Sequence, residues 1–133
     1  MSAERACYLD SSAIVKLAVA EPESAALRRY LRRRNVMVSS ALARAEVARA
    51  LLPLGPTAIQ RGHEVLNRIE ILRLDDRILR AAGSLLPVGL RTLDAVHLAS
   101  ALQIGSDLAR VITYDDRMAA AAAGLGMSVV APS

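Results

Sequence analysis

The stretch ACYLDSSAIVKLAVA, residues 6–20, passes from one backbone pattern to another across a single residue, Asp10. The run at 6–9 is short and apolar, as in a buried strand, whereas the run at 11–20 has the length of a helix and serines near its start. A strand that leads directly into a helix begins a strand–helix–strand unit. The stretch therefore predicts a parallel sheet that is covered by helices.

The same alternation continues through the rest of the chain. Further strands are expected at 36–39, 70–74, 110–114 and 127–131. Further helices are expected at 22–34, 41–52, 57–69, 76–86, 92–104 and 115–125. The pattern predicts an α/β fold, a three-layer sandwich with a central parallel sheet of four to five strands and helices on both faces. A length of 133 residues predicts a single domain over 1–133.

Composition indicates the kind of core that the protein has and the compartment in which it is found. Hydrophobic residues make up 53% of the chain, but with three Tyr and no Phe or Trp the core must be aliphatic. The lone Cys7 excludes an internal disulfide, which favours a reducing compartment. No apolar leader opens the sequence, and the longest apolar tract, at 118–131, is shorter than the ~20 residues of a membrane span. These features predict a cytoplasmic protein without a membrane partner.

Four acidic residues occupy comparable places in this pattern. Asp10 follows the first expected strand, Asp115 follows the strand at 110–114, and Asp94 lies in the first turn of its helix. Glu46 lies in a helix beside an apolar stripe. Ligands of parallel sheets collect at the carboxyl ends of the strands. Carboxylates that converge there repel one another unless a cation such as Mg²⁺ or Mn²⁺ is bound.

Each of these residues also has a simpler structural role. Asp10 and Asp115 are suited to cap the helices that they precede, and Asp94 complements a helix macrodipole. Glu46 is placed to pair with a neighbouring surface arginine. His97, one turn after Asp94, is most simply a hydrogen-bonded core or edge histidine. What favours a functional site is the placement of all four acids toward one edge of one sheet.

Four motifs resemble the successive motifs of the PIN-domain ribonucleases, in particular the VapC toxins of toxin–antitoxin pairs. They are YLDSSAIVKL (8–17), SALARAEVARAL (40–51), LRTLDAVHLASAL (90–102) and VITYDDRM (111–118). Their order matches that of the family, and together they span most of the chain. The resemblance implies the PIN fold and a metal-dependent endoribonuclease.

The resemblance also assigns roles to residues. It makes Asp10, Glu46, Asp94 and Asp115 the catalytic acids that hold Mg²⁺ or Mn²⁺, with Asp10 and Asp94 as the most direct ligands. Ser11 matches the small hydroxyl residue that follows the first acid. Further residues are candidates to support the acids by hydrogen bonds or proximity: Ser11, Thr92, Thr113, Asp116 and His97. His97 is expected to brace its helix or a neighbouring acid rather than to transfer protons.

The implied partners are an RNA substrate and a cognate VapB-type antitoxin, and a homodimer is expected. Taking the four acids from the 13 Asp and Glu leaves nine against 17 Lys and Arg. An acidic site within a basic surface suits a phosphate backbone. In the arginine-rich run at 27–35, Arg28, Arg32 and Arg33 are candidate contacts to RNA or antitoxin, and a solvated helix face is the alternative.

Three other interpretations compete with the nuclease. A receiver-like signalling domain needs a lysine on a late strand, but the one lysine, Lys16, lies in the first expected helix. A haloacid-dehalogenase-like phosphatase needs an aspartate two residues after the first, where this chain has Ser12. A PIN-like domain that binds RNA or antitoxin without cutting remains open, and metal-dependent cleavage would distinguish it from the nuclease.

Overall fold

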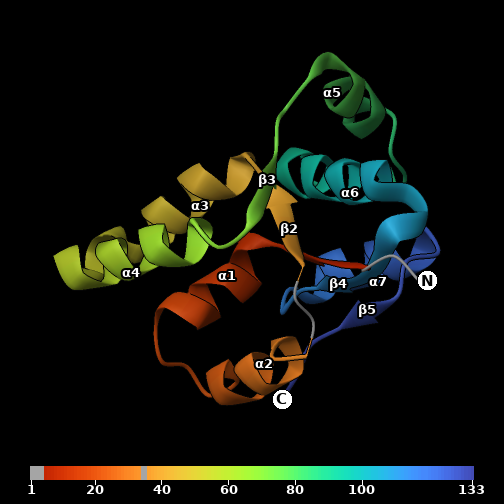
Figure 1. Ribbon diagram of the computed structural model, residues 1–133. Helices are drawn as coiled ribbons and strands as arrows, with labels where there is room; N and C mark the ends of the chain where they lie inside the picture. Colours follow the sequence, from red (N-terminus) through yellow and green to blue (C-terminus); the bar gives the residue numbers. More distant parts are fainter. Residues whose placement is uncertain (1–4, 34–35) are drawn as a thin grey trace.

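The computed structural model describes residues 5–33 and 36–133 as strands alternating with helices (Figure 1). The strands are β1 (Ala6–Leu9), β2 (Met37–Ser40), β3 (Glu70–Leu72), β4 (Leu108–Ile112) and β5 (Val129–Val130). The helices are α1 (Ser11–Ala18), α2 (Ser24–Leu31), α3 (Leu42–Leu51), α4 (Pro56–Leu66), α5 (Asp76–Gly83), α6 (Thr92–Ile104) and α7 (Asp116–Gly124). Short 3₁₀ turns, Leu52–Leu54 and Gly105–Asp107, follow α3 and α6. Within the described residues, no helix is long and apolar enough to cross a membrane.

The strands form one parallel sheet in the order β3-β2-β1-β4-β5. The expected α/β fold class is thereby confirmed. β1 is the central strand, and the chain builds outward from it in one direction through β2 and β3 and in the other through β4 and β5. Such a reversal of strand order opens a crevice at the carboxyl ends of the two strands that flank it. Here those strands are β1 and β4.

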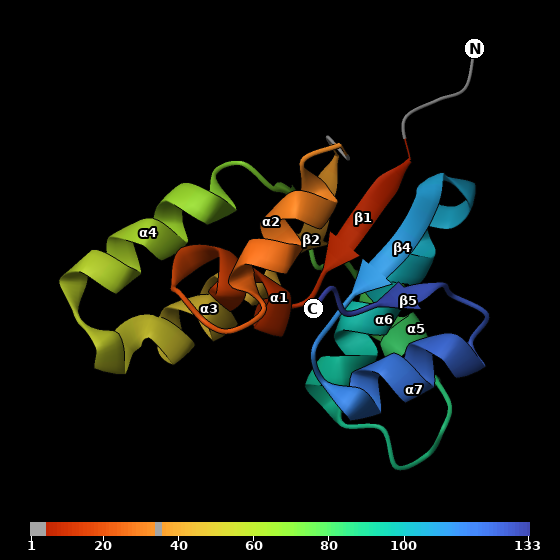
Figure 2. The same ribbon diagram turned by 90° about the horizontal axis from the view of Figure 1, so that it is seen from below.

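Helices cover both faces of the sheet, as Figure 2 shows. Side chains of a strand alternate between its faces. Cys7 and Leu9 of β1 therefore join the core formed with α1, α2, α3 and α4. Tyr8 points to the other face, where it packs with Val111 of β4 and Ala101 of α6. α6 and α7 meet on that second face through buried side chains that include Leu98 and Met118.

Several elements differ from the expected ranges because their partners set their limits. β4 was expected at 110–114, but it pairs with β1 from Leu108 and ends at Ile112, opposite the last residue of β1. Asp115 therefore lies beyond the strand end rather than directly after it. β3 was expected to reach residue 74, but it ends at Leu72, opposite Ser40 at the end of β2.

The second helix also begins later than its proline suggested. Pro22 lies in a turn, and α2 starts at Ser24. The Ser24 hydroxyl accepts a hydrogen bond from the backbone of Glu21 and donates one to the carbonyl of Val19. These bonds stabilise a turn over residues 19–24. Pro22 therefore lies in this turn and not, as was expected, at the start of the helix.

Gly62 of α4 faces Leu51 and Val47 of α3. A Cβ at this position would come within 2.5 Å of Leu51 Cδ1, and Leu51 is buried. Overpacking costs about 1–3 kcal/mol, against a gain of about 1 kcal/mol in helix propensity. We expect Gly62→Ala to lower the free energy of unfolding by about 1 kcal/mol in urea titrations. Gly83→Ala is the control, because a Cβ there meets nothing within 4 Å, and a stabilised Gly62→Ala would contradict the expectation.

Candidate active site

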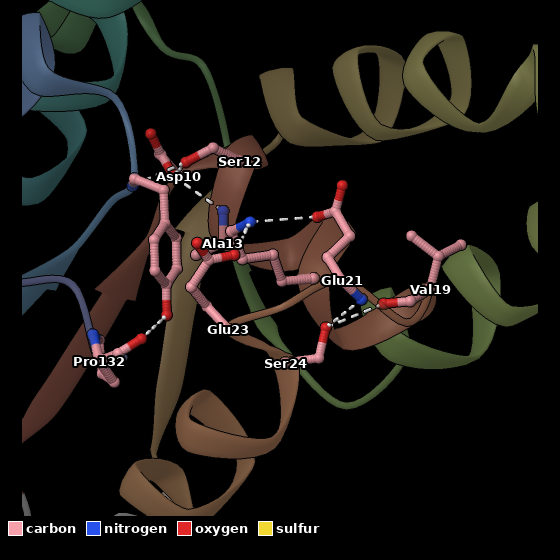
Figure 3. Close-up of polar contacts among 10 residues, drawn as sticks. Asp10, Ser12, Ala13, Val19, Glu21, Glu23, Ser24 and Pro132 are labelled. Carbon is pink, nitrogen blue, oxygen red and sulfur yellow. Dashed lines mark hydrogen bonds and ion pairs between the residues drawn. The ribbon is translucent and has the colours of Figure 1, made fainter.

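Asp10 lies directly after β1 and is almost fully buried. As the N-cap of α1 it accepts a hydrogen bond from the backbone of Ala13 at 3.1 Å (Figure 3). Its carboxylate also accepts hydrogen bonds from Ser12 Oγ at 2.6 Å and from Thr113 Oγ1 at 2.5 Å. The capping role and a place in a carboxylate site are therefore compatible, because three donors fix the group at the carboxyl end of the sheet.

Burial raises the pKa of Asp10, and the hydrogen bonds from Ser12, Thr113 and the backbone of Ala13 oppose that rise without cancelling it. A raised pKa in the folded state means that burying the ionised group reduces stability. This cost is absent below the pKa of the unfolded chain and appears as the pH rises through the pKa of the folded protein.

Thr113→Val keeps the shape of the side chain but removes one donor from this buried carboxylate, together with the oxygen that accepts a hydrogen bond from the backbone of Asp115. We expect it to lower the free energy of unfolding at pH 7 by about 1–3 kcal/mol. The loss of stability should become smaller as the pH falls through the pKa of Asp10, because burying a neutral carboxyl without this donor costs less than burying a carboxylate. Urea titrations across the pH range measure both effects. Thr57→Val, at an exposed position of α4, is the control, and an equal loss at every pH would contradict the assignment.

Asp115 is the N-cap of α7, where it accepts hydrogen bonds from the backbones of Arg117 at 2.9 Å and Met118 at 3.2 Å. Its own backbone N–H donates to Thr113 Oγ1 at 3.1 Å. Thr113 thus contacts both Asp10 and Asp115. The pairing of β1 with β4 brings these two acids to one place, although 103 residues separate Asp10 from Thr113.

Asp94 lies in the first turn of α6 beside Arg91, the N-cap residue. Arg91 Nε is 3.5 Å from Asp94 Oδ2, and Arg91 Nη2 is 3.9 Å from Asp115 Oδ2. The guanidinium therefore lies between two site carboxylates. Asp94 Oδ2 is nevertheless buried without a hydrogen-bond partner, and it is the one such side-chain atom among residues 5–33 and 36–133.

Glu46 projects from α3 into a chain of hydrogen bonds. Its Oε1 contacts His97 Nε2 and Ser11 Oγ, each at 2.5 Å. On the other side of the ring, His97 Nδ1 is 2.7 Å from the hydroxyl of Tyr8. When Tyr8 donates its proton to Nδ1 of a neutral His97, the ring carries its own proton on Nε2 and donates it to Glu46. His97 thus braces Glu46 from the buried side of the site.

These contacts determine whether Glu46 and Tyr8 are ionised at neutral pH. Burial alone would raise the pKa of Glu46, but the hydrogen bonds from His97 and Ser11 outweigh it and hold the pKa below its usual value. Burial raises the pKa of Tyr8 well above its ordinary range. Glu46 is therefore ionised at neutral pH while Tyr8 keeps its proton.

The other predicted residues lie away from this network. Thr92 is exposed at the first residue of α6, and Asp116 is exposed at the start of α7. Arg28, Arg32 and Arg33 are exposed, the first within α2 and the other two between α2 and β2. Arg33 lies beyond the end of α2, and Arg34 of the same run lies outside the described residues.

Sequence reasoning missed two contacts of this site. They are the hydrogen bond between Tyr8 and His97 and the ion pairs of Arg91 with Asp94 and Asp115. The spacing of Arg91 three residues before Asp94 was the available signal, because such pairs meet on a helix. The contact between Tyr8 and His97 spans 89 residues and left no local pattern.

Lys16 forms ion pairs with carboxylates other than the four predicted acids. Its ammonium pairs with Glu23 at 2.7 Å and Glu21 at 3.3 Å, and it lies 4.7 Å from the centre of the Tyr114 ring (Figure 3 shows the carboxylates). The hydroxyl of Tyr114 in turn donates to the carbonyl of Pro132. The chain's one lysine thus fastens the turn before α2 to the segment after β4.

Carboxylate oxygens are the ligands that Mg²⁺ and Mn²⁺ prefer. Within the described part of the chain, no three Asp, Glu, His or Cys side chains lie close enough together to hold a metal ion as they stand. Mg²⁺ is usually bound by one or two carboxylates, with waters and substrate phosphates as its other ligands. Asp94 Oδ2 is buried without a hydrogen bond and pairs with Arg91 at 3.5 Å. Together with the carboxylates of Asp10 and Asp115, it fits that manner of binding.

Fold and site together define an α/β domain with acidic residues along the carboxyl edge of a parallel sheet. The family model of the PIN domain matches residues 7–124. The chain therefore belongs to the PIN-domain family, which confirms the family predicted from the four motifs. It is 64% identical to Ribonuclease VapC46 of Mycobacterium tuberculosis over 96% of this chain and 98% of the relative. It is 39% identical to Ribonuclease VapC35 of the same species over 94% of this chain and 96% of the relative.

Solved structures share the fold at lower identity. M. tuberculosis VapC20, described as a toxin that cleaves the sarcin–ricin loop, matches with a TM-score of 0.75 and 15% identity over 95% of this chain and 99% of that one. A toxin–antitoxin complex from Klebsiella pneumoniae matches with a TM-score of 0.70 and 21% identity over 96% of this chain and 98% of that one. At these identities the likeness shows the fold alone.

Proposed function

We propose that this protein is a metal-dependent endoribonuclease and the toxin of a toxin–antitoxin pair. The observation that carries the proposal is the buried Asp94 Oδ2, which has no hydrogen-bond partner and lies in the same site as Asp10 and Asp115. Its ion-pair partner, Arg91, is 3.5 Å away and 62% exposed, so that it offsets the cost of burying this oxygen in part, and a bound cation would offset the rest. Relatives over nearly the full chain are named ribonucleases, which supports RNA as the substrate.

Asp10, Asp94 and Asp115 would hold Mg²⁺ or Mn²⁺, with Glu46 beside them. The cation, when bound, supplies charge for the phosphodiester in the transition state and lowers the pKa of a bound water. The residues of the chain prepare the site for it. Ser12 and Thr113 fix both oxygens of Asp10, and the cap of α7 fixes Asp115.

Glu46 is suited to orient the attacking water. His97 and Ser11 hold its carboxylate in place and keep it ionised at neutral pH. An ionised, oriented carboxylate accepts a hydrogen bond from water and so aims the lone pair of the oxygen at phosphorus. Because Glu46 is half-buried, one side of the group is still open to such a water.

The partners follow from the same proposal. A VapB-type antitoxin would neutralise the enzyme in the cytoplasm, and the family resemblance predicts a homodimer. The toxin–antitoxin complex from K. pneumoniae, which shares the fold, supports an antitoxin partner. Co-purification with the product of the adjacent reading frame tests the antitoxin, and light scattering tests the dimer.

The deciding experiment is cleavage of total cellular RNA by the purified protein with Mg²⁺, with Mn²⁺ and with EDTA. We expect discrete fragments with either metal, none in EDTA, and recovery of cleavage when metal is added back. Cleavage that persists in EDTA would refute metal dependence. RNA that is bound but never cut under any of these conditions would favour the domain that binds without catalysis.

A further inference from the structure

A cavity of about 700 Å³ opens beside the acidic site. It lies between α7 and the segment that joins α5 to α6, which runs past α7 in Figure 2. Leu86, Pro87, Leu90 and Leu125 make most of its wall apolar. Cavities of ~300–1,000 Å³ that are mainly apolar and carry a few polar groups are typical ligand sites.

The polar groups of this cavity connect it to the site acids. Asp94, Arg91 and Arg117 all line it. Whatever fills the cavity therefore adjoins the carboxylate that carries the proposed function. Two guanidinium groups beside an apolar wall suit a ligand that has an apolar, planar body and an anionic group, because arginine matches the geometry of phosphate.

Arg91 is held only by long ion pairs and can therefore contact such a ligand. Its distances to Asp94 and Asp115 are 3.5 and 3.9 Å, and its side chain is 62% exposed. Ion pairs of this length at the surface contribute little to stability. Arg91 can therefore turn from the carboxylates to an incoming phosphate at small cost.

We infer that this cavity receives one unpaired nucleotide next to the scissile phosphate and so selects the base at that position. The base would lie against Leu86, Leu90 and Leu125, with its phosphate toward Arg91 and Arg117. The inference rests on the proposed ribonuclease function and deepens it, because it assigns sequence preference to residues outside the four acids. An apolar antitoxin segment would suit the wall but would leave the two cations without an anionic partner.

Gly124→Leu tests the cavity with little risk to the fold. Gly124 ends α7 and lines the cavity, and a Cβ built on it meets no heavy atom within 4 Å. The control is Gly83→Leu, since Gly83 ends α5, has the same open space, and is not among the residues that line the cavity. Leu86→Ser is a second test, because Leu86 is 64% exposed and contributes little to the core. Thermal melts of all three variants check the fold.

The first measurement is cleavage of a randomised single-stranded RNA pool in Mn²⁺, with sequencing of the cut ends. We expect the parent to prefer one base beside the cut. In Gly124→Leu and Leu86→Ser that preference should fall roughly tenfold, the scale at which a hydrophobic pocket discriminates, while Gly83→Leu keeps it. A parent without a preference, or a Gly124→Leu protein with the parent's preference, would overturn the inference and leave the ribonuclease proposal intact.

The second measurement does not depend on catalysis. The methyl NMR signals of Leu86, Leu90 and Leu125 are followed as each of the four nucleoside 5′-monophosphates is added in EDTA. We expect saturable shifts that Gly124→Leu abolishes and Gly83→Leu retains. If these appear although the parent cuts no RNA, the ribonuclease proposal fails and the nucleotide site stands. If the methyl signals respond only to an antitoxin peptide, the cavity is a protein site and the inference is wrong.

Discussion

Asp94→Asn should reduce RNA cleavage at least about 10³-fold, equivalent to ~4 kcal/mol of transition-state stabilisation, without loss of stability. The substitution keeps the shape of the side chain but removes the charge that would bind a divalent cation. Asp94 Oδ2 is buried without a hydrogen-bond partner, and its ion pair with the exposed Arg91 spans 3.5 Å, so the charge contributes little to stability. The free energy of unfolding should therefore stay within about 1 kcal/mol of the parent value or rise.

Asp10→Asn should reduce cleavage to a similar extent. Asparagine caps a helix as well as aspartate does, and loss of the charge relieves the burial cost that raises the pKa of Asp10. The amide nitrogen cannot accept the hydrogen bond that Thr113 donates to Oδ2, so we expect a loss of about 1 kcal/mol in the free energy of unfolding. Initial cleavage rates and urea titrations of the same preparations measure both properties. Asp76→Asn is the matched control, since Asp76 lies in the first turn of α5, outside the site. An active Asp94→Asn enzyme, or one that is inactive only because it is unfolded, would contradict the assignment.

His97→Ala should have the largest effect on stability, a loss of about 2–4 kcal/mol. His97 is 2% exposed and contacts both Tyr8 and Glu46. Its removal leaves a cavity, deprives the buried Tyr8 hydroxyl of one partner, and takes one of two side-chain donors from Glu46. Cleavage should fall as well, because Glu46 would lose the contact that fixes its orientation.

Tyr8→Phe separates these contributions. It removes only the hydroxyl that contacts Nδ1 of His97, and we expect a loss of about 1 kcal/mol in the free energy of unfolding with most of the cleavage rate retained. Urea titrations and cleavage rates of both variants distinguish the contribution of the Tyr8 contact from that of the Glu46 contact. Equal losses for His97→Ala and Tyr8→Phe would show that the Glu46 contact contributes nothing to stability.

The sequence determined the local pattern of this protein. Short apolar runs alternate with stretches of helical pattern, and an acid often stands between them. This alternation predicted strands near their observed positions and a parallel sheet between helices. It also predicted that Asp10 and Asp115 follow strands and that Asp94 begins a helix. These features are readable because capping, periodicity and strand length depend on neighbours within a few residues.

Only the tertiary structure decided which of these residues meet. The strand order places β4 beside β1, which brings Thr113 to Asp10, and the packing of α6 on the sheet brings His97 to Tyr8 and Glu46. The tertiary structure also placed Arg91 between Asp94 and Asp115, and it left five predicted residues exposed: Thr92, Asp116, Arg28, Arg32 and Arg33. Such contacts join residues up to 103 positions apart. They depend on how whole elements pack, and no short stretch of sequence encodes that.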